Sequence, residues 1–502
     1  MKRLFTFAIA LVALVELAWN AEATWRPQGE PQYYGVSWAD TSSPLCIRTG
    51  SLKGVATGSK PDDSLIPIQA SMRRCILDDS GNVVYYLNPT DSTKKWGGGT
   101  ANLDGTDGQV MVEIPKFYYK YTYSSGHIWE ISLLPISGFS VHPAFIKDGK
   151  VVEFRYMSAY EGVLYDTSAS RYANGIYISD ANGVFEEDDD SITLSAPTNA
   201  FTNLEAGDKV TVSGTTSNNG TYTVATVADA VITVSEALTD ETDGAFVIGT
   251  QTDFTATTGD VLGSVTGKSP AIYGTRAQFR ATAANRGTGW RQQDYDLTSA
   301  IQLLYLVEYA SFYSQSVIGA GITAVADWDA YNDYNPIAQT GNSNSVGNVT
   351  GNTAGSTSSA TESTKYLSYR GIENFFGHLW KWVDGFNING NIPYVSNNRT
   401  HFADDTATNY TQIEDSAGSG ITLINADGYQ TSLEQTMRGF LPSAVGGALN
   451  TYVTDYYYQS TGWRVARLGG SASDGTVAGF LDWGLINSSG AAARNIAARV
   501  CY

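Results

Sequence analysis

Turn-forming residues interrupt this chain at short intervals over most of its length, and this spacing constrains the fold more than any other feature. Glycine alone occurs 51 times in 502 residues. Between the breaks lie short runs in which apolar and polar residues alternate, such as residues 33–38 and 209–213. Alternation over about four to eight residues between turn signals is typical of β-strands. The chain is therefore expected to be rich in short strands.

Composition and charge limit the functions that such a chain can have. Charged residues make up only 16% of the chain, aromatic residues make up 12%, and the net charge is −19. This composition is typical of β-rich extracellular and virion proteins, and the negative charge argues against nucleic acid as a partner, because that partner requires basic clusters. Four histidines and three cysteines are too few for a multi-cysteine zinc site or a disulfide framework.

The N-terminus has the layout of an export signal. Lys2 and Arg3 precede an apolar run over residues 4–15, and Ala21-Glu22-Ala23 follows as a small-x-small cleavage site. We therefore predict a signal peptide over residues 1–23 and a secreted or cell-surface protein; a short membrane-anchoring N-terminus is the alternative. No later apolar stretch reaches the roughly 18 residues that a membrane span needs.

Export allows Cys46 and Cys75 to form a disulfide, although two buried free thiols would give the same sequence, and Cys501 is expected to be buried and unpaired.

Composition divides the mature chain into segments. Residues 24–105 contain short strand candidates and are predicted to form a small N-terminal β-rich domain. Residues 180–255 are rich in Thr and Val, contain no His, Cys or Trp, and are predicted to form an inserted β-sandwich-like module. Five consecutive acids at 186–190 begin this module; they could bind Ca²⁺ or form a solvated loop, and no other cofactor is expected. Residues 106–179 and 256–502 are predicted to form one further domain around the insert.

One helix and one long loop are clear in the later part of the chain. Residues 299–312 are apolar nearly all round, and Ser299 with Gln302 suggests a capping box, so this helix is expected to be buried. Residues 339–364 are almost purely Gly, Ser, Thr, Asn and Ala. Such a loop is expected to be mobile unless another segment packs on it.

Motifs of the common enzyme classes are absent from the sequence. There is no phosphate-binding loop, dinucleotide fingerprint, HExxH or GxSxG motif. Asp404 and Asp405 are neighbouring acids, but a glycosidase needs two carboxylates that converge on a cleft, and nothing in the sequence singles out such a pair. We therefore expect neither catalytic nor metal-binding residues.

Several aromatic and glycine-rich phrases resemble a known superfamily. The phrases are YRGIENFFGHLWKWVDG at 369–385, GWRV at 462–465, LGG at 468–470 and RNIAARV at 494–500. They are similar to the C-type-lectin-like fold of the formylglycine-generating-enzyme superfamily. The closer similarity is to variable proteins targeted by diversity-generating retroelements and to phage tail receptor-binding proteins. Residues 35–38, 303–310, 314–319 and 440–447 resemble the same group.

This resemblance implies a fold and a function. It implies an α+β architecture, with a C-type-lectin-like domain over 106–179 and 256–502 that ends in a displayed, hypervariable C-terminal segment. The enzymes of the superfamily use two cysteines in this region, whereas here only Cys501 is present. The chain is therefore expected not to be an enzyme. Phage tail members usually lack an export signal, which favours a secreted or surface-displayed protein here over a virion tail protein.

The expected ligand-binding residues lie between Gly469-Gly470 and residues 496–499, which are expected to anchor the segment. They share small, polar or aromatic side chains that no core requirement explains, as in an adaptable paratope. They are Ser471, Ala472, Ser473, Asp474, Thr476, Asp482, Trp483, Asn487, Arg494 and Asn495. Trp and Arg are frequent interface hot spots, but a buried, structural Trp483 is an equal alternative.

Three functions compete on this evidence. The leading hypothesis is a non-enzymatic, adhesion-type protein, monomeric or homo-oligomeric, that binds a protein or glycan ligand on a cell surface. The first alternative is a structural protein of a phage tail or surface appendage. The second is a carbohydrate-active enzyme whose carboxylate pair the sequence does not reveal.

Overall fold

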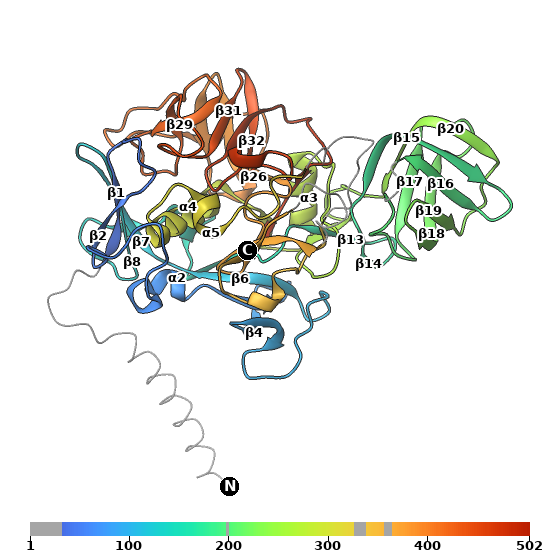
Figure 1. Cartoon of the computed structure of the whole chain (residues 1–502), viewed down its shortest axis with the longest axis horizontal. Helices are drawn as coiled ribbons and strands as arrows, with labels where there is room; N and C mark the ends of the chain where they lie inside the picture. The colour runs from blue at the N-terminus through green and yellow to red at the C-terminus, as the bar shows by residue number, and fades with distance from the viewer. Residues whose placement is uncertain (1–32, 197–199, 326–337, 356–363) are drawn as a thin grey trace, which may run out of the picture.

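The computed structural model describes residues 33–196, 200–325, 338–355 and 364–502. The expected signal peptide over 1–23 lies outside these ranges. Strands hold 38% of the described residues and helices 11%, with only four α-helices. The expected α+β class is therefore wrong, and the protein is mostly β (Figure 1). The physical reason is that turns break most segments before they reach the length at which a helix becomes stable.

The four helices are short except for α4. They are α2 (Pro67–Ala70), α3 (Arg276–Asn285), α4 (Tyr295–Tyr309) and α5 (Ser314–Ile318). Every residue of α4 is buried, which confirms the expected buried helix. Its N-cap, however, is Asp294, whose carboxylate accepts a hydrogen bond from the backbone N–H of Leu297 at 2.8 Å. Ser299 lies inside the helix and donates to the carbonyl of Asp296 instead.

Strands from the N-terminal region pair with strands from later segments. The first sheet has the order β2-β1-β8-β7-β9 and the second β22-β35-β12-β6-β3-β4-β5. The strands of the first are β1 (Tyr34–Trp38), β2 (Ile47–Gly50), β7 (Tyr118–Tyr123), β8 (His127–Ser132) and β9 (Ser140–Val141). The strands of the second are β3 (Arg73–Leu77), β4 (Val83–Asn88), β5 (Asp91–Lys95), β6 (Gln109–Pro115), β12 (Phe154–Ser158), β22 (Arg291–Gln292) and β35 (Val500–Cys501). Residues 33–105 therefore share their sheets with the rest of the body instead of forming sheets of their own.

The inserted segment folds as a closed six-stranded barrel rather than as two packed sheets. Its strands are β15 (Tyr177–Glu186), β16 (Ser191–Ala196), β17 (Lys209–Ser213), β18 (Gly220–Ala228), β19 (Val231–Val234) and β20 (Glu241–Thr250). The barrel has a hydrophobic core of its own, which includes Phe185, Phe246 and Ile248. Figure 1 shows it in green at one end of the molecule. The two ends of the insert lie side by side, because the N–H of Thr250 donates to the carbonyl of Ile176 at 3.0 Å.

The acidic run of the insert serves as a barrel turn. Residues 187–190 connect β15 to β16, and the Asp190 carboxylate accepts a hydrogen bond from the N–H of Leu238 at 3.0 Å. The N–H of Glu187 donates to Asp240 at 2.7 Å. Within the described residues, no group of three or more His, Cys, Asp or Glu side chains is placed to hold a metal ion.

The C-terminal part of the chain builds the largest sheet. Its order is β28-β27-β26-β32-β33-β31-β29-β30, with β34 beside β26. Its strands are β26 (Trp380–Asn389), β27 (Ile392–Val395), β28 (Thr411–Gln412), β29 (Gly428–Leu433), β30 (Pro442–Val445), β31 (Tyr456–Gln459), β32 (Trp463–Leu468), β33 (Trp483–Asn487) and β34 (Ile496–Ala497). Smaller sheets are formed by β10 (Ile146–Lys147) with β11 (Lys150–Val151), by β13 (Val163–Asp166), β14 (Arg171–Tyr172) and β21 (Val261–Gly263), and by β23 (Gly351–Thr353), β24 (Tyr366–Tyr369) and β25 (Ile372–Glu373).

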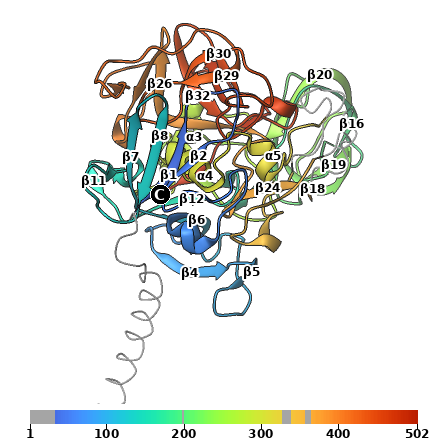
Figure 2. The same cartoon turned by 60° about the vertical axis from the view of Figure 1, so that its left-hand side comes forward.

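One hydrophobic core joins the N-terminal and C-terminal parts of the body. Helix α4 contacts β1 and β8 of the first sheet and β26 of the large sheet, and Figure 2 shows it enclosed among these elements. The same core contains Trp38 and Trp129 from the first sheet, Leu304 from α4 and Trp483 from the large sheet. Burial of large apolar side chains is the main stabilising contribution in such an arrangement.

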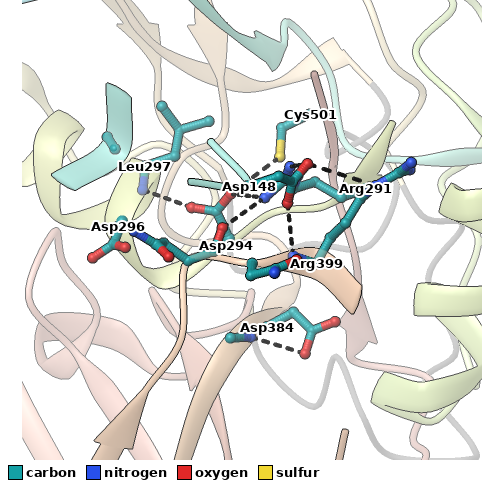
Figure 3. A network of polar contacts seen from close by, with 12 residues as sticks. Asp148, Arg291, Asp294, Asp296, Leu297, Asp384, Arg399 and Cys501 are labelled. Carbon is teal, nitrogen blue, oxygen red and sulfur yellow. Dashed lines mark hydrogen bonds and ion pairs between the residues drawn. The ribbon is translucent and has the colours of Figure 1, made fainter. Parts of the chain in front are cut away.

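A buried network of charges ties the C-terminal strand to α4 (Figure 3). The Asp294 carboxylate that caps α4 also accepts a hydrogen bond from Arg155 at 2.6 Å, and Arg291 lies 3.9 Å away. Burial alone would raise the pKa of Asp294, but the two arginines outweigh burial and lower it. The sulfur of Cys501 lies 3.9 Å from the same carboxylate. Cys46, Cys75 and Cys501 are all buried free thiols, so the alternative without a disulfide holds.

The described part of the polar loop, residues 338–355, is packed against the second sheet, and Arg74 makes several of the contacts. Arg74 is completely buried. Its guanidinium donates to Ser343 at 2.6 Å and to Asn344 at 3.1 Å, and its backbone N–H donates to Asn348 at 2.8 Å. The loop was expected to be mobile unless another segment packs on it. Such packing is present, because the short polar side chains of the loop satisfy the buried charge of Arg74.

Candidate recognition surface

The ten residues expected to bind a ligand divide into a buried and an accessible group. Ser471, Ala472, Asp482 and Trp483 are completely buried. Ser473 and Thr476 are exposed, and Asp474, Asn487, Arg494 and Asn495 are half-buried. The buried group cannot contact a ligand in this structure, which corrects the expectation for these four residues.

Trp483 is a core residue, as one of the two alternatives proposed. Its indole N–H donates to the carbonyl of Phe440 at 3.0 Å. Its ring packs against Tyr295 at 5.7 Å and Phe386 at 6.2 Å between ring centroids. Because side chains alternate along β33, Gly484 faces the opposite side of the sheet.

That opposite side carries a row of aromatic rings that the sequence analysis missed. Tyr458 lies 6.1 Å from Trp380, Tyr456 lies 4.7 Å from Tyr458, and Tyr429 lies 5.2 Å from Tyr456. Trp380 is buried, whereas the three tyrosines are half-exposed. We call Tyr429, Tyr456 and Tyr458 the tyrosine ladder. The run Tyr456-Tyr457-Tyr458 contained the signal for it, since strand alternation places the first and third rings on one face.

Arg467 lies next to the tyrosine ladder, and a glycine on the neighbouring strand leaves room for its side chain to lie flat on the sheet. Its guanidinium carbon lies 4.1 Å over the ring of Trp380. In the sheet it pairs with Gly484, where a Cβ would come within 2.6 Å of the arginine Nε. Burial lowers the pKa of Arg467, although Asp474 and Asp482 oppose that shift. The glycine therefore leaves the space in which a cation stacks on an indole.

Two buried acids lie beneath this surface. Burial raises the pKa of Asp482 well above its usual range, and Asp474 and Asp455 raise it further. Burial also raises the pKa of Asp455 to about 8. One oxygen of Asp455 accepts a hydrogen bond from the N–H of Leu481 at 2.7 Å. Burial therefore favours the neutral form of both carboxyl groups.

The loop that follows β32 borders the ladder and is held from two sides. The hydroxyl of Ser471 donates to Asp474 at 2.8 Å. The side-chain amide of Gln315 donates to the carbonyls of Gly475 and Ala478, both at 2.8 Å. Thr476 lies 3.2 Å from the hydroxyl of Tyr429. The loop is therefore ordered by contacts beneath it, while Ser473 and Thr476 face the solvent.

The segment before β34 lies at the other end of the ladder. The carbonyl of Asn495 accepts a hydrogen bond from the N–H of Trp380 at 2.9 Å. Ala491 and Ala493 pack against the hydrophobic cluster that contains Trp380 and Tyr458. The structure thus brings Asp474, Thr476 and Asn495 to one surface with the ladder.

One cluster of side chains contains residue types that are common in active sites, but this cluster is buried. Glu161, His378 and Lys381 form a buried cluster in which the Lys381 ammonium lies 3.0 Å from Glu161, and His378 contacts the other oxygen. Burial alone would raise the pKa of Glu161, but His378 and Lys381 outweigh it and hold the pKa at about 2. Burial lowers the pKa of Lys381 to about 8. All three side chains are buried, with exposed fractions of 2% or less.

A cavity of about 830 Å³ lies on the body, where it is lined by residues such as Asp79, Asp107, Arg171, Lys268 and Arg286. Its basic side chains already have acidic partners: Arg171 and Lys268 contact Glu205 of the insert at 2.8 and 2.6 Å, and Arg286 contacts Asp79 at 2.8 Å. The two ion pairs of Glu205 attach the barrel to the body, whereas the pair of Arg286 and Asp79 lies within the body.

Comparison with known proteins assigns no family to this surface. No protein-family model matches the chain, and no curated protein is significantly similar to it. None of the helices in the described residues has the length and apolar character needed to cross a membrane.

Proposed function

We propose that this chain is a non-enzymatic binding protein that recognises a protein or glycan ligand on a cell surface through the tyrosine ladder and its borders. The observation that carries the proposal is the contiguous row of half-exposed rings at Tyr429, Tyr456 and Tyr458, which continues from the buried Trp380. A hydrophobic core requires no such row at the surface.

The chemistry of the surface suits recognition better than catalysis. Tyrosine offers a large contact area with a hydrogen-bonding hydroxyl at a low cost in side-chain entropy, and small polar neighbours adapt to a partner. The ladder stands on strands β29 and β31, so binding requires little ordering of the backbone. Asp474, Thr476 and Asn495 provide polar groups at its borders.

The sequence resemblance described above supports the same function. Variable proteins of that kind carry a displayed C-terminal recognition segment, and Ser473, Asp474, Thr476, Asn487, Arg494 and Asn495 are the accessible members of the segment here. The predicted export signal over residues 1–23 favours a secreted or surface-displayed protein; a virion tail protein is the alternative. Self-association into a homo-oligomer remains part of the proposal.

Binding to cells tests the proposal directly. Fluorescently labelled protein is titrated onto a panel of bacterial and animal cells, and the double variant Tyr429→Ala/Tyr456→Ala is compared with the wild type on each cell type that binds. We expect the variant to lose about tenfold in affinity, or roughly 1.4 kcal/mol, with a similar melting temperature. Tyr123→Ala, which removes an exposed ring from β7 in the first sheet, is the matched control. Equal affinity of the double variant and this control would contradict the proposal.

A further inference from the structure

A concave site apart from the tyrosine ladder lies on the face of the seven-stranded sheet. It is a groove of about 590 Å³ between the end of α2, the strands β3, β6 and β12, and the polar loop at residues 348–350. It shares no lining residue with the tyrosine ladder. Its volume falls within the range of about 300–1,000 Å³ that is usual for small-ligand sites.

The floor of the groove is a fully satisfied carboxylate. Strand register places Arg73, Glu113 and Tyr156 in one row on the sheet. Glu113 is 2% exposed and accepts hydrogen bonds from Arg73 at 3.0 and 3.1 Å, from Tyr86 at 3.1 Å and from Tyr156 at 3.0 Å. With its oxygens occupied in this way, Glu113 holds the donors in position and is not poised as a catalytic acid.

The other charges of the groove are also paired. Asp63 lies 3.0 Å from Lys60 and 2.8 Å from Arg370, and Arg370 also contacts the buried Glu308 at 2.7 Å. Three cations thus face three carboxylates: Lys60, Arg73 and Arg370 against Asp63, Glu113 and Glu308. The groove therefore has no excess charge that would attract an ion, but the Arg73 side chain is 37% exposed, and only its Nε and one of its two Nη atoms donate to Glu113.

Apolar side chains at the rim of the groove are unusually exposed. The exposed fraction is 47% for Trp96, 42% for Phe154 and 50% for Val349. The backbone of Trp96 is fixed to the sheet by a hydrogen bond from its main-chain N–H to the carbonyl of Tyr86 at 2.9 Å. The guanidinium of Arg73 lies 3.6 Å over the ring of Tyr86, which orients it toward the groove. Exposed apolar groups gathered around one polar groove mark a binding site more than a solvated surface.

We infer that this groove binds a neutral oligosaccharide. A pyranose ring has an apolar C–H face, which packs on a flat indole or phenyl ring, and hydroxyl groups, which exchange hydrogen bonds with fixed, mutually paired charges. Trp96 and Phe154 supply the flat faces, and Arg73 supplies the donor. A charged saccharide would leave its charge uncompensated in a groove whose own charges already balance. The site is separate from the ladder, so the inference does not depend on the proposed function.

Calorimetric titration with defined saccharides tests this inference. The full chain is titrated with neutral cello-, malto-, xylo- and chito-oligosaccharides, with anionic oligogalacturonate, and with a mixture of apolar peptides. We expect a neutral saccharide to bind at micromolar to millimolar concentration. Trp96→Ala and, separately, Phe154→Ala should each weaken that binding about tenfold. Because both side chains are largely exposed, neither change should disturb folding, which circular dichroism verifies.

Two further variants show whether the effect is specific to this groove. Trp96→Phe retains an aromatic face and should keep its affinity within about threefold of the wild type. Tyr429→Ala/Tyr456→Ala alters only the ladder and should bind the saccharide as the wild type does. Failure of every neutral saccharide, binding of the anionic saccharide or the peptides alone, or wild-type affinity in both alanine variants would overturn the inference.

Discussion

At the scale of single residues, Asp455 carries the clearest physical consequence. This acid is completely buried beneath the recognition surface, and its pKa is raised to about 8 by burial. A carboxyl group with a raised pKa binds its proton more tightly in the folded protein than in the unfolded chain. Its favourable contribution is therefore complete below the unfolded pKa of about 3.9 and is lost as the pH rises through about 8.

Asp455→Asn should remove this pH dependence, because an amide still accepts the hydrogen bond from Leu481 but does not ionise. Each such group lowers the free energy of unfolding by about 1.4 kcal/mol per pH unit between the two pKa values. The variant should thus become more stable relative to the wild type as the pH rises from about 5 to 8. Urea unfolding at several pH values measures the difference. Asp188→Asn, at an exposed acid of the barrel turn, should keep the wild-type slope; an unchanged slope in Asp455→Asn would contradict the prediction.

At the scale of elements, the start of α4 differs from the expectation, because its N-cap is Asp294 and not Ser299. Asp294→Ala removes the N-cap and leaves Arg155 buried without its carboxylate partner. We expect a loss of about 3–5 kcal/mol in the free energy of unfolding. Ser299→Ala, at the cap that the sequence suggested, removes only a bond to the carbonyl of Asp296 and should cost under about 1 kcal/mol. Chemical denaturation compares the two, and a larger loss in Ser299→Ala would refute this assignment.

Elements whose pattern is local were predictable from the sequence. The strands at 209–213, 221–227 and 231–234 appear close to those positions, because alternation and turn residues determine each strand without distant contacts. The buried helix was also predictable, but the sequence analysis placed its start at Ser299, whereas Asp294 caps it by accepting from the N–H of Leu297. The tyrosine ladder depends on the register between β29 and β31, and register is a property of paired strands rather than of either one.

At the scale of the whole molecule, the barrel should be separable from the body. Both of its ends leave the body at one place, and its core is its own. Replacing residues 178–248 by a short Gly-Ser turn should leave a soluble body that melts cooperatively and retains both binding activities. Calorimetry and the titrations above test this. Loss of the folded body would show that the contacts of Glu205 with Arg171 and Lys268 are essential to it.

Neither the fold class nor the burial of the expected site residues could be predicted from the sequence, because both depend on how distant segments pack together. The resemblance to the C-type-lectin-like fold implied an α+β architecture, but the many short strands dominate the structure once they are paired. Ser471 and Asp482 resemble surface residues in sequence, yet the loop that contains Ser471 folds back over Asp482 and covers both. Burial of a polar side chain depends on which segment lies above it, and no local pattern encodes that.

The position of β35 has a consequence for how the protein is made. This strand lies inside the seven-stranded sheet, between β22 and β12, and is held there by contacts of Arg155 and Asp294 with Tyr502 and Cys501. On the ribosome, every other strand of that sheet is synthesised before it. The sheet therefore keeps an open gap between β22 and β12 until β35 is synthesised, so it is completed only after all its other strands are available. Until then the exposed edges need protection from aggregation, so a chaperone that binds the nascent chain is expected to matter more for this protein than its final stability suggests.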